Sequence, residues 1–444
     1  MQWLGAAVFL ATSNFASTAK AGELAYAIGY IGEHSDNIQR SSSSPRSEMI
    51  NSAIAGVDYR ENGPALDAHV QATAEYRDFR NNVYNDGPLY YSDASLLWKI
   101  SPQQLHWTFV DRYDQVTRDA TLPGTPSNMI SSNVLSTGPD LYARLGSVNT
   151  LALELRYGEA TYGEGDYNNN RHGGAVRWQY TATTQLKYSL NYEIVNIKYD
   201  NPILNDNLER HDLYMRADLR DARMRFLLDL GGTHIYRERA GETSGYIARL
   251  TWSQQLTSGS TAGILAASEY LDAGTVLLST ATSPVPVTGA PPGSTFTSEV
   301  TNDFFYMKRA EAYYARSDSS TELNARIFYR DINYEVAPLD RQETGGLLEV
   351  TYKATSLLST SVYGGYVSAQ YQNISRDDRV SELGVRLLYR LSRNLSAALD
   401  GRKTRRYSSD LSQEFTDNRA LFSLIYSSSP LFTPHKEMTG GHVS

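Results

Sequence analysis

The chain has 444 residues, of which 41% are hydrophobic, and its formal net charge is −8. It contains no run of about 20 apolar residues, which excludes helical membrane spans. Cysteine is absent, which excludes disulfides, thiolate metal sites and cysteine nucleophiles. A chain this polar can still cross a membrane as a β-barrel, because only every second strand residue then meets lipid.

The first 21 residues have the pattern of an export signal. A short apolar run covers residues 4–11, and Ala19-Lys20-Ala21 supplies a small-x-small cleavage pattern. No positive charge precedes the apolar run, which departs from the usual pattern. We expect cleavage after Ala21, so that residues 1–21 are a signal peptide and the mature chain reaches the bacterial outer membrane.

The segments that follow alternate between apolar and polar residues. Between residues 322 and 330, for example, Ala325 and Ile327 alternate with Asn324 and Arg326. A period of two places successive side chains on opposite faces of a sheet, one toward lipid and the other toward a wet lumen. The pattern predicts an all-β fold, a single transmembrane antiparallel β-barrel over residues 22–426.

Connections between these segments are alternately short and long, which predicts about 20 strands. Nine short connections carry turn formers and are expected on the periplasmic side, together with both termini. The number is even, as in bacterial single-chain barrels, and errors would come in pairs, so 18 strands is the alternative. The predicted strands cover residues 23–31, 48–59, 65–77, 91–100, 104–114, 131–145, 149–159, 171–181, 185–198, 209–219, 223–236, 243–254, 260–270, 304–315, 320–333, 342–353, 358–371, 379–390, 394–405 and 417–426. The expected extracellular loops include residues 33–46, 115–129, 158–171, 200–209 and 407–417.

Two further segments stand apart from the strand pattern. The loop from Asp272 to Asp303 is the longest and is rich in Pro, Gly and Thr. Long loops of this kind are functional or disordered, so we expect either a mobile surface loop or a segment folded into the lumen as a gate. We expect no plug domain, because the first predicted strand begins directly after the signal peptide; either this loop or a periplasmic partner would then have to close a twenty-stranded barrel. Residues 427–444 are expected to form a polar, disordered periplasmic tail.

The polar strand face carries many arginines. A structural interpretation is that they pair with acids on neighbouring strands; a functional one is that they bind carboxylates or phosphates of a passing polymer. Basic residues outnumber acids on this inferred face, which favours a conduit that tolerates anions. The candidate lumen-facing, polymer-binding residues are Arg77, Arg144, Arg156, Arg177, Arg216, Arg220, Arg225, Arg249, Arg326, Arg330, Arg386, Arg390 and Arg402. The interspersed acids include Glu75, Glu154, Glu193, Asp212, Asp218, Asp229, Glu322, Glu349 and Glu382.

Two stretches of the sequence carry a family resemblance. Residues 32–38 (GEHSDNI), followed by 40–42 and 47–50, form one stretch, and residues 136–141 (STGPDL), running into 144–146, form the other. They resemble outer-membrane β-barrel proteins associated with exopolysaccharide and PEP-CTERM (exosortase) systems of Gram-negative bacteria. The resemblance implies an outer-membrane barrel for building or exporting extracellular polysaccharide, with no defined catalytic residues. The long loop and the extended tail depart from the family pattern.

No motif of catalysis or metal binding is present. The chain lacks a G-x-S-x-G elbow and a P-loop, and no two histidines have the spacing of H-E-x-x-H. A surface enzyme would need a nucleophile and a base near the outer rim, where His34, His172 and His211 are the expected histidines. The eight histidines lie at positions 34, 69, 106, 172, 211, 234, 435 and 442.

Three functions remain open on these grounds. The favoured one is a conduit for export or assembly of an anionic exopolysaccharide, with lipid, the polysaccharide and possible periplasmic export proteins as partners. The alternative is a general diffusion porin for small solutes, and a surface barrel enzyme is the least favoured. We expect no catalytic residues, no cofactor, no metal and no nucleic-acid partner.

Overall fold

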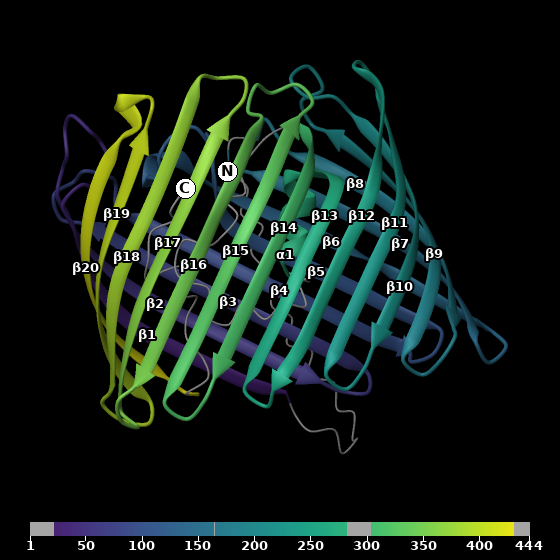
Figure 1. Ribbon diagram of the computed structural model, residues 1–444, viewed down its shortest axis with the longest axis horizontal. Helices are drawn as coiled ribbons and strands as arrows, with labels where there is room; N and C mark the ends of the chain where they lie inside the picture. The colour runs from purple at the N-terminus through teal and green to yellow at the C-terminus, as the bar shows by residue number, and fades with distance from the viewer. Residues whose placement is uncertain (1–21, 164, 282–302, 430–444) are drawn as a thin grey trace.

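The chain forms one closed antiparallel barrel of twenty strands (Figure 1). The computed structural model describes residues 22–163, 165–281 and 303–429. Each strand pairs with its neighbours in the sequence, and β1 pairs with β20 to close the sheet. The strands are β1 (Glu23–Ser35), β2 (Glu48–Asn62), β3 (Leu66–Phe79), β4 (Gly87–Ser101), β5 (Leu105–Thr117), β6 (Met129–Leu145), β7 (Asn149–Tyr162), β8 (Asn169–Thr181), β9 (Leu186–Tyr199), β10 (Leu208–Arg220), β11 (Met224–Arg237), β12 (Gly241–Thr257), β13 (Ser260–Asp272), β14 (Phe304–Ser317), β15 (Thr321–Tyr334), β16 (Arg341–Lys353), β17 (Leu358–Tyr371), β18 (Arg376–Arg390), β19 (Leu395–Ser408) and β20 (Phe415–Ser427). The helical elements in the described residues are α1 (Ala273–Ala281), η1 (Pro126–Asn128) and η2 (Leu411–Gln413).

The predicted fold class is confirmed, with twenty strands rather than eighteen. Several strands extend further into the loops than expected; β1, for example, continues to Ser35, and β20 begins at Phe415. The extra residues keep the alternation of the strand, but their Asn, Ser and Asp content looks like loop in the sequence. The predicted signal peptide, the middle of the long loop and residues 430–444 of the tail lie outside the described residues.

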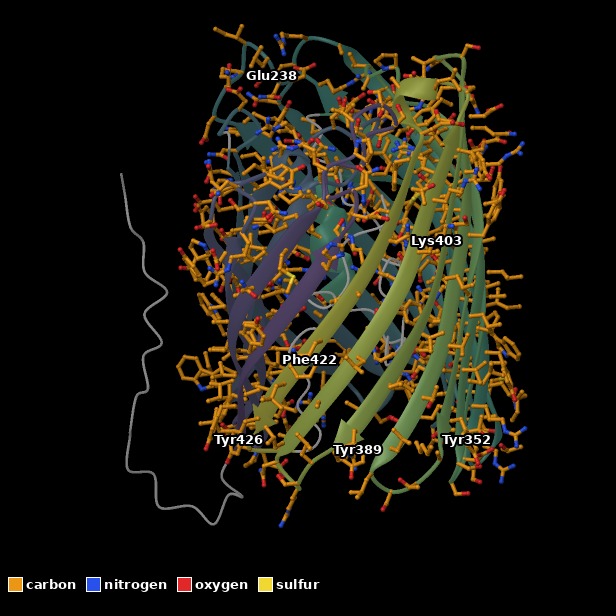
Figure 2. All side chains as sticks on the ribbon, turned by 90° about the vertical axis from the view of Figure 1, so that its left-hand side faces the viewer. Glu238, Tyr352, Tyr389, Lys403, Phe422 and Tyr426 are labelled. Carbon is orange, nitrogen blue, oxygen red and sulfur yellow. The ribbon has the colours of Figure 1, made fainter. Side chains whose placement is uncertain are left out.

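The outward face of the barrel is apolar over its middle. Ile327 and Leu383, both on this face, are 66% and 64% exposed. Tyr352, Tyr389 and Tyr426 point outward near the short turns, below Phe422 (Figure 2). An apolar band between aromatic girdles is the surface that a lipid bilayer stabilises, so the strands span a membrane. By the usual arrangement of outer-membrane barrels, we assign the short turns to the periplasmic side and the loops at the other end to the extracellular side.

No helix among the described residues is long and apolar enough to cross a membrane.

Inward-facing side chains are buried toward the loops and exposed toward the turns. On β10, Asp212 is 4% and Tyr214 2% exposed, whereas the side chain of Arg220 at the turn is 62% exposed. On β18, Asp378 is buried and Arg390 is exposed. We call these two regions the extracellular half and the periplasmic half of the lumen. The extracellular half is packed with side chains, and the periplasmic half is open to solvent.

The seam between β1 and β20 is held by side chains from opposite ends of the sequence. Arg419 Nη1 lies 2.7 Å from Glu33 Oε1, and the Ser35 hydroxyl donates to Asp417 Oδ1 at 2.6 Å. Glu33 and Asp417 are both buried. These contacts fix the register of the last strand against the first, in addition to the backbone ladder.

Candidate functional site: the lumen

Helix α1 lies inside the barrel, between the wall that includes β14–β17 and the wall formed by β2–β6 (Figure 1). Its side chains join two inward-facing apolar clusters. Leu277 packs with Val134 and Ile130 on β6, whereas Val276 packs with Leu271 and Met307 on β13 and β14. The helix therefore bridges separate parts of the lumen wall. This places residues 273–281 of the predicted gating loop in the lumen rather than on the surface, and residues 282–302 lie outside the described part.

An ion pair anchors the start of α1. Arg171 Nη2 on β8 lies 2.5 Å from Asp272 Oδ1 at the end of β13. The Thr275 hydroxyl donates to the same carboxylate, and Arg171 Nη1 donates to that hydroxyl at 3.3 Å. Both charged side chains are almost completely buried, so each would be costly to leave unpaired. At its other end the loop is anchored at Asp303, whose Oδ2 accepts from the backbone N–H groups of Val336 and Ala337 at 2.6 and 2.8 Å.

The loop between β5 and β6, residues 118–128, also crosses the lumen. The carbonyl of Thr121 accepts from Arg376 Nη2 at 2.5 Å and from Arg406 Nη2 at 3.3 Å, on β18 and β19. The hydroxyl of Tyr371 donates to the Ala120 carbonyl at 3.4 Å. The segment is a loop at the expected end of the barrel, but its inward fold was not predicted from the sequence. No local signal reveals the inward fold, because the contacts join residues more than 250 positions apart.

The first loop adds a third inward contact. Arg40, with a φ of 52°, donates from Nη1 to the Gly124 carbonyl at 3.0 Å and lies 3.7 Å from the Asp417 carboxylate. Its guanidinium also stacks over the Phe415 ring. Burial lowers the pKa of Arg40 to about 10, so it remains charged at neutral pH. Together with α1 and residues 118–128, this contact closes much of the extracellular half.

All thirteen predicted arginines point inward, by the register of their strands. Nine have a carboxylate partner, so the structural interpretation holds for most of them. The nine pairs are Arg77–Glu75 (2.8 Å), Arg156–Asp140 (2.5 Å), Arg177–Glu154 (2.6 Å), Arg216–Asp229 (2.7 Å), Arg220–Asp218 (2.7 Å), Arg249–Glu269 (2.6 Å), Arg330–Glu343 (3.4 Å), Arg386–Asp400 (2.9 Å) and Arg402–Glu33 (3.9 Å).

Four of the thirteen have no ion pair with any described residue. Arg144 and Arg390 lie at the periplasmic ends of β6 and β18, and Arg225 is the second residue of β11. Arg326 is the sixth residue of β15. All four therefore belong to the periplasmic half, and we call them the vestibule arginines. Arg144 and Arg390 are exposed, Arg225 and Arg326 are half-buried, and no described acid neutralises any of the four charges.

The inward face carries further acids and further arginines beyond those named from the sequence. Acids that had been assigned to loops and ends lie inward and pair with arginines that the sequence interpretation also missed. Strict alternation carried through the longer strands would have found both groups. The additional inward acids include Glu33, Asp140, Glu269, Glu311, Glu343, Asp378, Asp400 and Asp417, and the additional inward arginines include Arg171, Arg210, Arg237, Arg309, Arg341, Arg376, Arg406 and Arg419.

The rim histidines face outward, away from the lumen. His172 packs edge-on against Tyr157, and His211 lies 2.7 Å from the Tyr192 hydroxyl. The sequence interpretation named His34, His172 and His211 as the rim histidines and missed His234, which directly faces His211 on β11. Within residues 22–163, 165–281 and 303–429, no group of three or more His, Asp or Glu side chains is arranged to hold a metal ion.

Comparisons with known proteins agree with a barrel architecture. A family model described as putative beta-barrel porin 2 matches residues 344–426, which span β16 to β20. No curated protein matches the chain. Among solved structures, OccK2 (OpdF) of Pseudomonas aeruginosa in complex with glucuronate is 10% identical, covers 92% of this chain and 98% of its own, and has a TM-score of 0.39.

Two iron-uptake proteins are similar at the same level. The FrpB iron transporter of Neisseria meningitidis is 10% identical, with a TM-score of 0.45 and coverage of 90% of this chain and 81% of its own. The siderophore receptor PirA of P. aeruginosa is 12% identical, with a TM-score of 0.43 and coverage of 91% and 80%. At these TM-scores none of the three carries a functional conclusion. The chain is a membrane-spanning barrel of the outer-membrane type, similar to a porin family over its last five strands.

Proposed function

We propose that this barrel is an outer-membrane conduit for an anionic sugar polymer, in export or assembly of an exopolysaccharide. The observation that carries the proposal is the group of four vestibule arginines. They are unpaired among the described residues and face the lumen; Arg144, Arg225 and Arg390 lie near the periplasmic ends of their strands, and Arg326 lies further along the lumen. A polymer leaving the periplasm would meet these guanidinium groups first.

Guanidinium groups bind carboxylates and phosphates through paired hydrogen bonds, and contacts in solvent are weak enough to release. A conduit needs both properties, since the cargo must enter but must also leave. The paired arginines further along the lumen are already neutralised by protein carboxylates and offer less attraction. The resemblance at residues 32–50 and 136–146 agrees with a role in polysaccharide export.

In this proposal the extracellular half is a closure that opens for the polymer. Helix α1, residues 118–128 and Arg40 are held in it by hydrogen bonds and ion pairs. A periplasmic export protein that docks at the short turns is the partner we would expect to supply the polymer. Co-purification of this protein with the barrel from membranes would test for such a partner.

A diffusion porin for small solutes is the second candidate, and the match of residues 344–426 to a putative porin family favours it. A loop folded into the lumen would then set the size limit for solutes. The two candidates differ in their response to polymer. A diffusion porin passes small ions steadily, whereas a polymer conduit is blocked by its cargo from the periplasmic side.

The experiment is a planar-bilayer recording of the purified barrel, with a uronic-acid oligosaccharide as the anionic probe. We expect anion-selective current and block by the probe added on the periplasmic side, with little block by a neutral dextran of similar length. Replacing the four vestibule arginines by glutamine should abolish both the selectivity and the block. Equal block by dextran, or unchanged block in the variant, would contradict the proposal.

A matched control is Arg316→Gln. Arg316 lies at the same periplasmic end but points outward, where it pairs with Asp318 at 3.2 Å. This change removes a positive charge from the same level of the barrel without altering the lumen. Its selectivity and block should equal those of the wild type.

A further inference from the structure

Three polar side chains meet on the outward face of the β11–β12 hairpin, near its extracellular end. His234 Nδ1 lies 2.6 Å from Ser244 Oγ, and His234 Nε2 lies 3.4 Å from Glu242 Oε2. His234 and Ser244 face each other across the ladder, and Glu242 is two residues from Ser244 on the same face of β12. An imidazole between a hydroxyl and a carboxylate is the arrangement that activates a serine as a nucleophile.

The aromatic surroundings hold the imidazole in place. The ring of Tyr236 lies edge-on to His234, with centroids 4.4 Å apart, and also contacts His211 at 5.6 Å. His211 has its own partners, the Tyr192 hydroxyl at 2.7 Å and Glu209 at 2.8 Å. An interfacial belt of His and Tyr accounts for His211, because both side chains suit the membrane surface. It does not account for a primary hydroxyl aligned on His234, with a carboxylate on the opposite side of the ring.

The depth of Ser244 identifies the substrate that can reach it. The outward face of β12 carries Trp252 near the periplasmic end and then, toward the extracellular end, Leu250, Tyr246 and Ser244. All are even-numbered, so they share this face. A strand rise of ~3.4 Å per residue and a tilt of ~40° place Ser244 about 20 Å above Trp252, close to the top of an apolar band ~25 Å tall. Ser244 and Glu242 are exposed. At that level the outer leaflet presents the ester groups that join its acyl chains to the headgroups.

We propose that Ser244, His234 and Glu242 hydrolyse acyl esters of outer-leaflet lipids, an activity separate from the conduit. Ser244 Oγ attacks the ester carbonyl while His234 takes the hydroxyl proton, and the Glu242 carboxylate stabilises the imidazolium. Collapse of the tetrahedral intermediate breaks the ester C–O bond, and His234 returns the proton to the leaving alcohol. Water then attacks the acyl-serine with His234 as the base, which releases the carboxylic acid and restores Ser244.

The test uses the full-length barrel in detergent micelles, with a fluorophosphonate probe and with p-nitrophenyl laurate. The probe phosphonylates an activated serine with loss of fluoride, so mass spectrometry should find the adduct on Ser244. Ser244→Ala should abolish labelling, and Ser244→Ala and His234→Asn should each lower laurate turnover by about 10³-fold or more, by analogy with other serine triads. Glu242→Gln should lower turnover by a smaller factor.

His172→Asn is the matched control, because His172 is also an outward rim histidine packed on a tyrosine. It should keep both labelling and turnover. Heat-modifiable migration in detergent gels checks that each variant is a folded barrel, and bilayer conductance checks that the conduit is unaffected. An adduct on another serine, no adduct at all, full turnover in Ser244→Ala, or faster hydrolysis of p-nitrophenyl acetate than of laurate would overturn the proposal.

Discussion

The two halves of the lumen are built from the same strands but differ in whether their arginines are buried in ion pairs with carboxylates. In the extracellular half, arginines and carboxylates are buried together, as in Arg376 and Arg406 around Asp378 at 2.9 and 2.6 Å. In the periplasmic half, the vestibule arginines have no acid within reach among the described residues. In the extracellular half the charges are neutralised by buried protein contacts, whereas in the periplasmic half the four vestibule arginines form no ion pair with a described residue, although Arg220 pairs there with Asp218.

The difference shows that arginine content alone does not identify a binding surface. Arg386 and Arg390 are four residues apart on the same face of β18, yet Arg386 bonds the buried carboxylate of Asp400 at 2.9 Å and Arg390 bonds no described acid. What distinguishes them is the neighbouring strand, where β19 provides an aspartate opposite Arg386 and a serine opposite Arg390.

The largest effect is expected from a carboxylate in the packed half. Asp378→Leu leaves Arg376 and Arg406 without their shared partner in a buried site, which costs about 3–5 kcal/mol of unfolding free energy. Arg390→Gln, in the open half, should change it by less than about 0.5 kcal/mol, as for exposed sites. Urea unfolding in detergent measures both. Similar losses in the two variants would remove the distinction between the halves.

Neighbouring positions on β15 provide the second contrast, between lipid and lumen. Ile327→Arg places a charge on the lipid-facing side and should cost about 2–4 kcal/mol, whereas lumen changes mainly tune selectivity. Arg326→Gln, one residue away, should be tolerated because Arg326 has no described acid partner. Folding yield into lipid vesicles measures the difference. A greater loss in Arg326→Gln would mean that the face assignment is reversed.

Loosening α1 should increase conductance without unfolding the barrel. Asp272→Ala removes the partner of Arg171 and the acceptor of Thr275, which destabilises the docked position of the helix. We expect larger single-channel currents than in the wild type, with normal heat-modifiable migration. The matched change Asp318→Ala, in a periplasmic turn, should leave conductance unaltered. Equal currents in both variants would mean that α1 does not limit the open lumen.

The smallest effect concerns ionic strength. Raising salt from 0.1 to 1 M shortens the Debye length from about 10 to about 3 Å, which screens exposed charges far more than buried pairs. Block by the uronic-acid probe should therefore weaken, because the vestibule arginines face solvent. Unfolding free energy should change much less, since the pairs of the extracellular half are buried. Block that is independent of salt would place the binding site among the buried arginines instead.

The barrel and its faces could be predicted from the sequence because strand alternation is a local property. Ile327 and Arg326 point to opposite faces as expected, and the nine short turns separate the predicted strands. The closure could not be predicted in the same way. Whether the Thr121 carbonyl contacts Arg376 depends on the diameter and stagger of the closed sheet. Neither quantity can be predicted from a short segment of the sequence.

The same limit explains the errors at individual charges. Arg216 and Asp229 become partners only when β10 and β11 are in register. The vestibule arginines can therefore be identified only after all the ion pairs across the sheet are known. His234 lies near the end of a predicted strand, and its partners Ser244 and Glu242 belong to the next one. Its outward direction was available from alternation, but its contacts were not.

The seam between β1 and β20 has a consequence for folding kinetics. Glu33 and Arg419 are separated by 386 positions, and Ser35 and Asp417 by 382. Contacts of such high sequence separation form late, because loop-closure entropy must be lost before they are gained. Glu33 and Asp417 are therefore expected to remain hydrated until the last strand pairs with the first. Fluorescence quenching between two probes placed on either side of this seam would report closure of the barrel rather than formation of its hairpins.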